Sequence, residues 1–220
     1  MKKIYLLALA LTTSLSFGQL TENFDAALGL PSGWTAFIGA NGEGTVENWD
    51  VVANTRAYSA ANCEYVRYEV VATAAQDWLV TPLVDLTNYT AVSLNYWGGS
   101  QYTAEYGTIY TVRVSTTSQT DINSFTTVAT YGEVDFPTTT PMSSQKTVDL
   151  SAYNGQQIYV AFVMEQNDGD NWFVDNVDVT GTLGTSSFNN FETKVSLYPN
   201  PTSGLVNILT KENVETIEVY

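Results

Sequence analysis

Apolar and polar residues alternate along several short stretches of this chain, with the period of two that a β-strand produces when one face meets water. Val92, Leu94 and Tyr96 share one face of residues 91–97, and residues 109–115 alternate in the same way. Thr, Val and Tyr, which are common in strands, supply most of these positions. Both stretches therefore predict strands of a sheet with one solvent-exposed face.

Residues 157–166 show a different pattern, because apolar residues occupy both alternating sets of positions. This predicts a strand that is central in its sheet and covered on both faces. Six further strands are predicted at residues 49–52, 63–71, 77–81, 125–131, 146–150 and 172–180. Turn signals such as Gly98-Gly99 and Asp168-Gly169 separate the strands. Short strands without helical periodicity predict an all-β fold, a sandwich of the jelly-roll type.

The N-terminus has the pattern of a secretory signal peptide, predicted at residues 1–18. Lys2 and Lys3 precede the apolar run of residues 4–11, and Ser16 and Gly18 supply the small residues that suit a signal peptidase. We expect cleavage before Gln19. The apolar run is shorter than the roughly 20 residues that a membrane-spanning helix needs, so we expect a secreted chain without a transmembrane segment.

The charge balance is strongly acidic and limits the possible partners. The chain has 23 Asp and Glu residues, 8 Lys and Arg residues and no His, for a net charge of −15. Nucleic acids and anionic membranes are therefore poor partners, whereas cations are good ones. Hydrophobic residues make up 44% and charged residues 14% of the chain, which is typical of a folded protein and not of a disordered acidic tail.

Catalytic chemistry finds little support in the sequence. Without His there is no Ser, Cys or metal hydrolase site of the usual kinds, and no nucleophile elbow or phosphate-binding loop is present. Cys63 is the single cysteine, so no internal disulfide forms, and we interpret it as a small buried hydrophobe. One enzyme alternative stays open: a carboxylate pair that hydrolyses glycosides, which predicts two acids in a cleft, one of them with a raised pKa.

The C-terminal part carries a resemblance in residues 194–209, which include Tyr198-Pro199-Asn200-Pro201-Thr202-Ser203-Gly204, and in Ile217 to Tyr220. It resembles the start of the type A sorting domain of type IX secretion, which implies export across the outer membrane of Bacteroidetes-type bacteria. An ordinary interdomain turn is the alternative. The family's domain normally continues through more strands, so we expect residues 193–220 to be a partial sorting domain, after a Gly-, Ser- and Asn-rich linker at residues 181–192.

A second resemblance covers residues 19–180 and rests on several motifs in a fixed order. The motifs are Phe24-Asp25, Leu30-Pro31-Ser32-Gly33-Trp34, Trp49, Gln76-Asp77-Trp78 with the following Leu-Val-Thr-Pro, Val84-Asp85-Leu86, and residues 148–153, 158–162 and 172–177. This order is similar to that of the cleaved-adhesin, or choice-of-anchor J, domains, which are MAM-like jelly rolls known from the adhesin regions of gingipains. At two motif positions an amide, Gln76 or Asn176, replaces the family's usual Asp.

The resemblance implies a structural calcium ion where the first and last strands meet. Its ligands would be Asp25 and Asp175, with Asp77 and Glu22 as neighbours, because calcium takes several carboxylate and carbonyl oxygens. The alternative is that Asp77 and Asp175 cap turns or accept backbone N–H bonds. A second acid-rich stretch, residues 167–171, lacks the full calcium-loop pattern, and we interpret it as a solvated turn.

Aromatic residues are the other candidate chemistry. The four tryptophans at motif positions are expected in the core: Trp34, Trp49, Trp78 and Trp172. Residues 96–106 place several rings around a predicted turn, and Trp97, Tyr102 and Tyr106 are candidate ligand-binding residues. Ordinary strand-end tyrosines are the alternative.

These observations predict a secreted or cell-surface adhesin-type module that binds and does not catalyse. We expect it to be stabilised by calcium, exported by the type IX secretion machinery, and directed at a glycan or an extracellular or host matrix protein. The alternative is a carbohydrate-active enzyme with a carboxylate pair.

Overall fold

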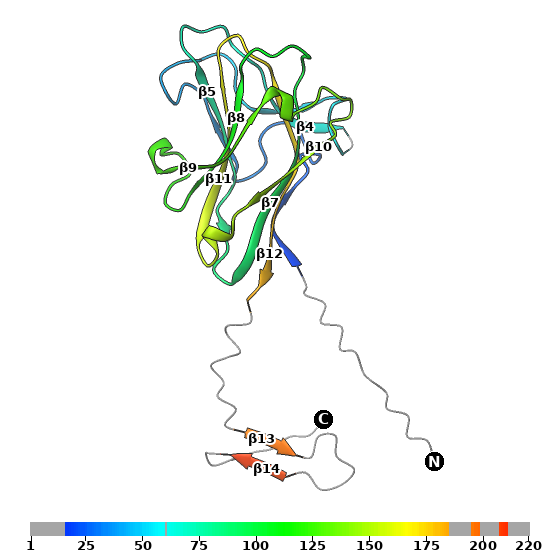
Figure 1. Ribbon diagram of the computed structural model, residues 1–220, viewed down its shortest axis with the longest axis vertical. Coiled ribbons are helices and arrows are strands. Elements are labelled where there is room, and N and C mark those ends of the chain that lie inside the picture. The colour runs from blue at the N-terminus through cyan, green and yellow to red at the C-terminus, as the bar shows by residue number, and fades with distance from the viewer. Residues whose placement is uncertain (1–15, 60, 185–194, 199–206, 211–220) are drawn as a thin grey trace, which may run out of the picture. The chain divides into compact units, whose positions relative to one another are not determined.

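A computed structural model describes residues 16–59, 61–184, 195–198 and 207–210 (Figure 1). The chain divides into two compact units, residues 1–183 and 184–220, which are described separately. Among the described residues, no helix is long and apolar enough to cross a membrane.

The first unit contains two six-stranded sheets, and every strand pairing in them is antiparallel. Sheet I has the order β10-β7-β12-β4-β3, with β1 also paired to β12. Its strands are β1 (Ser16–Glu22), β3 (Asp50–Ala53), β4 (Asn62–Val66), β7 (Tyr89–Gly99), β10 (Ser144–Asp149) and β12 (Trp172–Leu183).

Sheet II has the order β2-β5-β11-β8-β9, with β6 also paired to β11. Its strands are β2 (Thr35–Phe37), β5 (Ala75–Val80), β6 (Val84–Asp85), β8 (Ile109–Ser115), β9 (Thr126–Gly132) and β11 (Gln157–Gln166). Three short 3₁₀ turns lie at η1 (Ile122–Ser124), η2 (Glu133–Asp135) and η3 (Ser151–Tyr153). The chain crosses between the sheets at most connections after β4, as in a jelly roll. The predicted all-β sandwich is confirmed.

The strand predicted to be central, β11, lies in the middle of sheet II. Val160 and Phe162 point into the core between the sheets, whereas Ala161 and Val163 pack with Trp78 on the outer face. A strand covered on both faces needs apolar residues at every position, which explains why alternation is lost there.

The predicted turn at Gly98-Gly99 is wrong, because both glycines lie inside β7. A Cβ atom on Gly98 would lie 2.3 Å from a ring carbon of Phe136. The glycine therefore serves close packing of an aromatic ring on the strand. The turn itself follows in residues 100–108.

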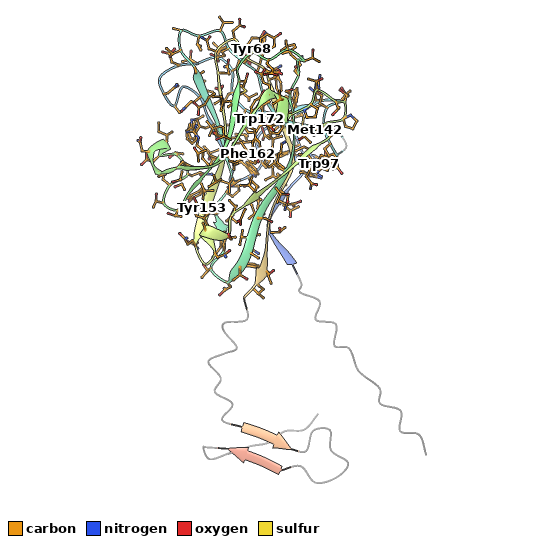
Figure 2. All side chains as sticks on the ribbon, viewed as in Figure 1. Tyr68, Trp97, Met142, Tyr153, Phe162 and Trp172 are labelled. Carbon is orange, nitrogen blue, oxygen red and sulfur yellow. The ribbon has the colours of Figure 1, made fainter. Side chains whose placement is uncertain are left out.

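The core between the sheets is rich in aromatic rings. Trp172 packs against Trp49 and Tyr110, with ring centroids 5.2 and 5.0 Å apart, near the centre of the sandwich (Figure 2). All four tryptophans predicted to be internal are buried: Trp34, Trp49, Trp78 and Trp172. These rings supply much of the apolar area that a chain without disulfides must bury.

The predicted signal peptide and the predicted sorting segment lie only partly within the described residues. Residues 1–15 of the predicted signal peptide lie outside the described residues, whereas Ser16, Phe17 and Gly18 pair with β12. In the second unit, β13 (Val195–Tyr198) pairs antiparallel with β14 (Asn207–Thr210). Most of the linker and the rest of the predicted sorting segment lie outside the described residues.

Candidate ligand-binding end and buried carboxylates

Tyr68 lies at one end of the sandwich (Figure 2), and the rings of Tyr102 and Tyr106 gather beside it. Tyr68 follows β4, whereas Tyr102 and Tyr106 belong to the loop between β7 and β8. The ring of Tyr102 lies 6.2 Å from that of Tyr68 and 5.9 Å from that of Tyr106, both in edge-to-face geometry. Tyr102 is 37% exposed and Tyr106 is 50% exposed, so their rings are accessible to a partner.

A buried carboxylate fixes the loop that carries Tyr102. Asp170 is fully buried, and its side chain accepts hydrogen bonds from the backbone N–H groups of Gln101, Tyr102 and Asn171, at 3.0, 3.0 and 2.6 Å. Burial raises the pKa of Asp170, and the three N–H donors partly oppose that rise because they favour the charged form. The backbone N–H dipoles thus stabilise the charged form of the Asp170 carboxylate.

Asn171 and Glu133 fasten the other tyrosines in the same way. Asn171 accepts from the backbone N–H of Tyr68 at 3.0 Å. Glu133 accepts from the N–H groups of Tyr106 and Thr108 at 2.6 and 2.8 Å. Both anchors are buried, so two loops that are distant in sequence are held together at this end.

The prediction of a solvated turn at residues 167–171 therefore holds for the exposed residues 167 and 168 but is wrong for residues 169–171. Asp170 and Asn171 are buried, and they bind the loops around them. The sequence pattern suggested an exposed turn because Asn, Asp and Gly also favour turns. The partners of these two side chains lie roughly 70 to 100 residues earlier in the chain, and no local pattern reveals them.

Trp97 does not join the tyrosines. Its ring stacks on Tyr58 with centroids 3.6 Å apart and an angle of 8°, and it packs beside a small outer cluster that includes Met142. Figure 2 shows Trp97 on the side of the sandwich, away from Tyr68. Of the three predicted ligand-binding residues, only Tyr102 and Tyr106 come together.

Two of the predicted calcium ligands, Asp25 and Asp175, lie close to each other. Asp175 accepts hydrogen bonds from the N–H groups of Tyr58 and Ser59 at 2.8 and 3.1 Å, and Asp25 accepts from Asn62 N–H at 3.2 Å. Burial, with the charge of Asp25 as a smaller cause, raises the pKa of Asp175 to about 6. The arrangement matches the alternative expected for Asp175, in which it accepts backbone N–H bonds.

Glu22 lies near an acid that sequence reasoning did not single out, Glu64 of β4. Glu64 pairs with Val174 in β12 and with Val51 in β3, which are both core residues, so its side chain also points between the sheets. It is fully buried, and neither carboxylate oxygen has a hydrogen-bond partner. Burial, then the charges of Asp50 and Glu22, raise the pKa of Glu64 to about 8.

Asp77 lies elsewhere, in β5 of sheet II, and is not a neighbour of Asp25 and Asp175 as the resemblance implied. It is fully buried, and neither oxygen has a partner within hydrogen-bonding geometry. Burial and the charge of Glu69 raise its pKa to about 7, while the nearby side chain of Gln166 acts in the lowering direction. Asp77 thus needs either a proton or a cation.

The four acids with raised pKa values are all fully buried: Glu64, Asp77, Asp170 and Asp175. A polysaccharide cannot reach any of them, so they offer no support to the carboxylate-pair enzyme. Within the described ranges, no group of three or more His, Cys, Asp or Glu side chains is arranged to hold a metal ion. Glu64 and Asp77 fit a cation best, because their oxygens have no other partner.

Comparison with known proteins identifies the family. The family described as Cleaved Adhesin Domain matches residues 18–181. The chain belongs to the cleaved adhesin family. Hemagglutinin A of Porphyromonas gingivalis is 31% identical over an alignment of 194 residues that covers 77% of this chain but only 7% of that protein's length.

Solved structures agree with this cleaved adhesin assignment. The K1 cleaved adhesin domain of Lys-gingipain from Porphyromonas gingivalis W83 has 26% identity and a TM-score of 0.58, and the match covers 76% of this chain and 99% of that one. The K3 domain of the same protein, with 22% identity and a TM-score of 0.57 over 75% of this chain and 98% of that one, shares the fold.

Cys63 of this cleaved adhesin domain is buried, as predicted. Burial, then the charges of Asp175, Glu64 and Asp25, raise the pKa of its thiol to about 12. A thiol that stays protonated is a poor nucleophile, so Cys63 is a packing residue.

Proposed function

We propose that this cleaved adhesin domain is an extracellular binding module whose partner engages Tyr68, Tyr102 and Tyr106. One observation carries the proposal: buried side chains are used to hold exposed rings in place. Burying a carboxylate is costly, yet Asp170 and Glu133 are placed where they order the loop that carries two of these rings. Pre-ordered tyrosines lose little entropy on binding and are frequent hot spots.

The partner class is a glycan or an extracellular or host matrix protein. The relative named hemagglutinin A supports binding as the activity. Tyrosine rings can stack on a sugar face or pack against protein side chains, so both classes of partner suit the surface formed by Tyr68, Tyr102 and Tyr106. The acidic composition makes nucleic acid a poor partner.

We also propose export by the type IX route to the cell surface or the medium. The predicted signal peptide at residues 1–18 would direct the chain across the inner membrane. The Tyr198 to Gly204 motif and the apolar residues around it would then be read by the type IX secretion machinery. The test compares a secreted reporter with and without residues 181–220 fused to its C-terminus. Export that needs these residues is the expected result, and export that persists without them would contradict the proposal.

Calcium is the proposed stabilising ion. Glu64 with Glu22 is one candidate ligand set and Asp77 is another, because buried carboxylate oxygens without a partner favour a bound cation. Asp25 and Asp175 remain candidate ligands, although backbone N–H groups already occupy part of their binding capacity. The ion would neutralise buried charge and tie the first strand to its neighbours.

Binding can be tested with the full chain on glycan and matrix-protein arrays. Changing Tyr102 and Tyr106 together to Ala should weaken binding by about 1 kcal/mol or more for each ring. Tyr58→Ala is the matched control, because Tyr58 is similarly exposed but lies against Trp97. If only the control variant loses binding, the binding site is the Tyr58 and Trp97 face and the proposal is wrong.

A further inference from the structure

We infer that the end of the sandwich that carries Tyr68, Tyr102 and Tyr106, here called the tyrosine end, selects a protein partner that presents an Asp or Glu side chain. Arg67 is the residue that binds this carboxylate. The inference rests on the proposed function and specifies its ligand. It follows from which basic side chains of the described residues are already paired within the fold, from a small pocket beside Tyr68, and from the residues that border this pocket.

The other described basic residues are already engaged inside the fold. Arg56 donates hydrogen bonds to four carbonyl oxygens of two loops, those of Ser100, Gln101, Thr138 and Thr139. Arg113 is bound to Glu165 and lies over the Trp78 ring. Lys146 lies over the rings of Tyr131 and Phe136. None of these three charges is presented to a partner at the tyrosine end.

Arg67 differs from them in exposure and in pairing. Its side chain is 54% exposed, and its guanidinium lies 5.5 Å from the centre of the Tyr68 ring. Its ion pair is with Glu47, at 3.7 Å, a distance at the outer limit for such a pair. An exposed pair of this length contributes little to stability, so Arg67 can exchange Glu47 for another carboxylate at low cost.

A pocket of about 290 Å³ lies at this point and is suited to one side chain of a partner. Its lining combines a ring, a guanidinium, two carboxylates and two aliphatic groups: Val46, Glu47, Arg67, Tyr68, Glu69 and Val70. The carboxylate of Glu69 is occupied, because it accepts the backbone N–H groups of Thr45, Val46 and Glu47. Arg67 is therefore the group that meets an incoming acid, with Glu47 as its competitor and with the charge of Glu69 opposing the acid.

The edges of the pocket favour a peptide over a sugar acid. Val46 and Val70, which line the pocket together with Arg67, are largely exposed. Apolar side chains next to the partner's acid would cover these valines, whereas the hydroxyl groups of a sugar would lose hydrogen bonds to water against them. The planar guanidinium group of an Arg binds a carboxylate with two parallel hydrogen bonds, so Arg67 would distinguish a carboxylate from an uncharged side chain.

The test titrates the full-length chain with a matched pair of capped tripeptides, acetyl-Leu-Glu-Leu-amide and acetyl-Leu-Gln-Leu-amide, and with glucuronic acid. Binding is followed through the NMR signals of the Arg67 Nε–H group and of the Tyr68 ring. We expect the Glu peptide to bind about two- to fivefold more tightly than the Gln peptide, as befits an exposed ion pair. Arg67→Gln should abolish this preference, and Glu47→Gln should increase it because the competing carboxylate is gone.

Lys146→Gln is the control variant and should keep the preference. Equal affinity for the two peptides, no shift with either, or tighter binding of glucuronic acid would each overturn the inference. The proposed function is judged separately by the Tyr102 and Tyr106 double variant on the arrays. If that variant loses its partner while Arg67→Gln keeps it, only the carboxylate inference fails.

Discussion

Two regions of this domain bury carboxylates, and they do so in opposite ways. At the tyrosine end, Asp170 and Glu133 are surrounded by backbone N–H groups at hydrogen-bonding distance. In the interior, Glu64 and Asp77 are buried as deeply, but none of their oxygens has a hydrogen-bond partner. The difference lies in the partners and not in the depth of burial.

This difference separates two roles for a buried acid. A carboxylate that accepts several N–H bonds has donors that favour its charged form, and it fixes the backbone that donates them, so it can order a loop. A carboxylate without partners is stable only when a proton or a cation neutralises it. The tyrosine end is thus ordered by the chain itself, whereas the interior responds to pH and, as we propose, to calcium.

The largest expected effect is at the tyrosine end. Asp170→Ala leaves three buried or half-buried N–H groups without an acceptor, and we expect it to lower the free energy of unfolding by about 3 kcal/mol. Urea unfolding measures the loss. Asp170→Asn, which keeps one acceptor oxygen, should lose clearly less. A loss below about 1 kcal/mol for Asp170→Ala would show that the loop does not depend on this anchor.

Calcium should have the next largest effect, and it should act on the interior. A ligand that binds only the folded state adds about 2.7 kcal/mol at one hundred times its Kd. Thermal melting in excess calcium and in excess chelator should therefore differ by several degrees. Glu64→Gln should remove most of this difference, whereas Glu105→Gln, a change at an exposed acid, should keep it. If Asp77→Asn removes it instead, the ion belongs in sheet II, and equal melting temperatures would exclude the ion altogether.

Without calcium, stability should fall as the pH rises from about 5 to 8. The pKa of Glu64 is about 8 in the folded state against an ordinary value of 4.5, so the folded chain retains a proton that the unfolded chain releases. The contribution is complete below pH 4.5 and is lost as the pH rises towards 8. Asp77, with a pKa of about 7, acts in the same direction. Urea unfolding across this range should show a shallower slope for Glu64→Gln, and a rising stability curve in the wild-type chain would contradict the assignment.

The smallest effect on stability is expected for the rings themselves. Tyr106 is half exposed and is held through its backbone N–H group, which a substitution to Ala retains. Tyr106→Ala should change the free energy of unfolding by no more than about 0.5 kcal/mol, as is usual for surface positions. Urea unfolding in parallel with Asp170→Ala would then compare an exposed ring of this loop with a buried anchor of the same loop. A loss near that of Asp170→Ala would identify Tyr106 as a packing residue.

Local sequence pattern determined most of the strands. Alternation located β7 and β8, and its absence located β11 at the centre of sheet II. β1 was missed because it overlaps the predicted signal peptide, and the very short β2 and β6 were missed because strands of three and two residues leave no periodic pattern. The strand predicted at residues 63–71 was too long, since β4 ends at Val66. The burial of the four motif tryptophans and of Cys63 also followed from residue type and position. These features depend on each residue's own side chain and its nearest neighbours in the chain.

The candidate sites depended on neighbours that are distant in sequence. Residues 167–171 resemble an exposed turn, yet Asp170 is buried because the backbone of Gln101 and Tyr102 folds over it. Glu64 lies in a stretch of ordinary alternation, and only its place in sheet I, between β3 and β12, shows that its face of the strand is closed to water. The energy of a carboxylate is set by the dipoles and solvent around it, and the tertiary structure alone brings those groups together.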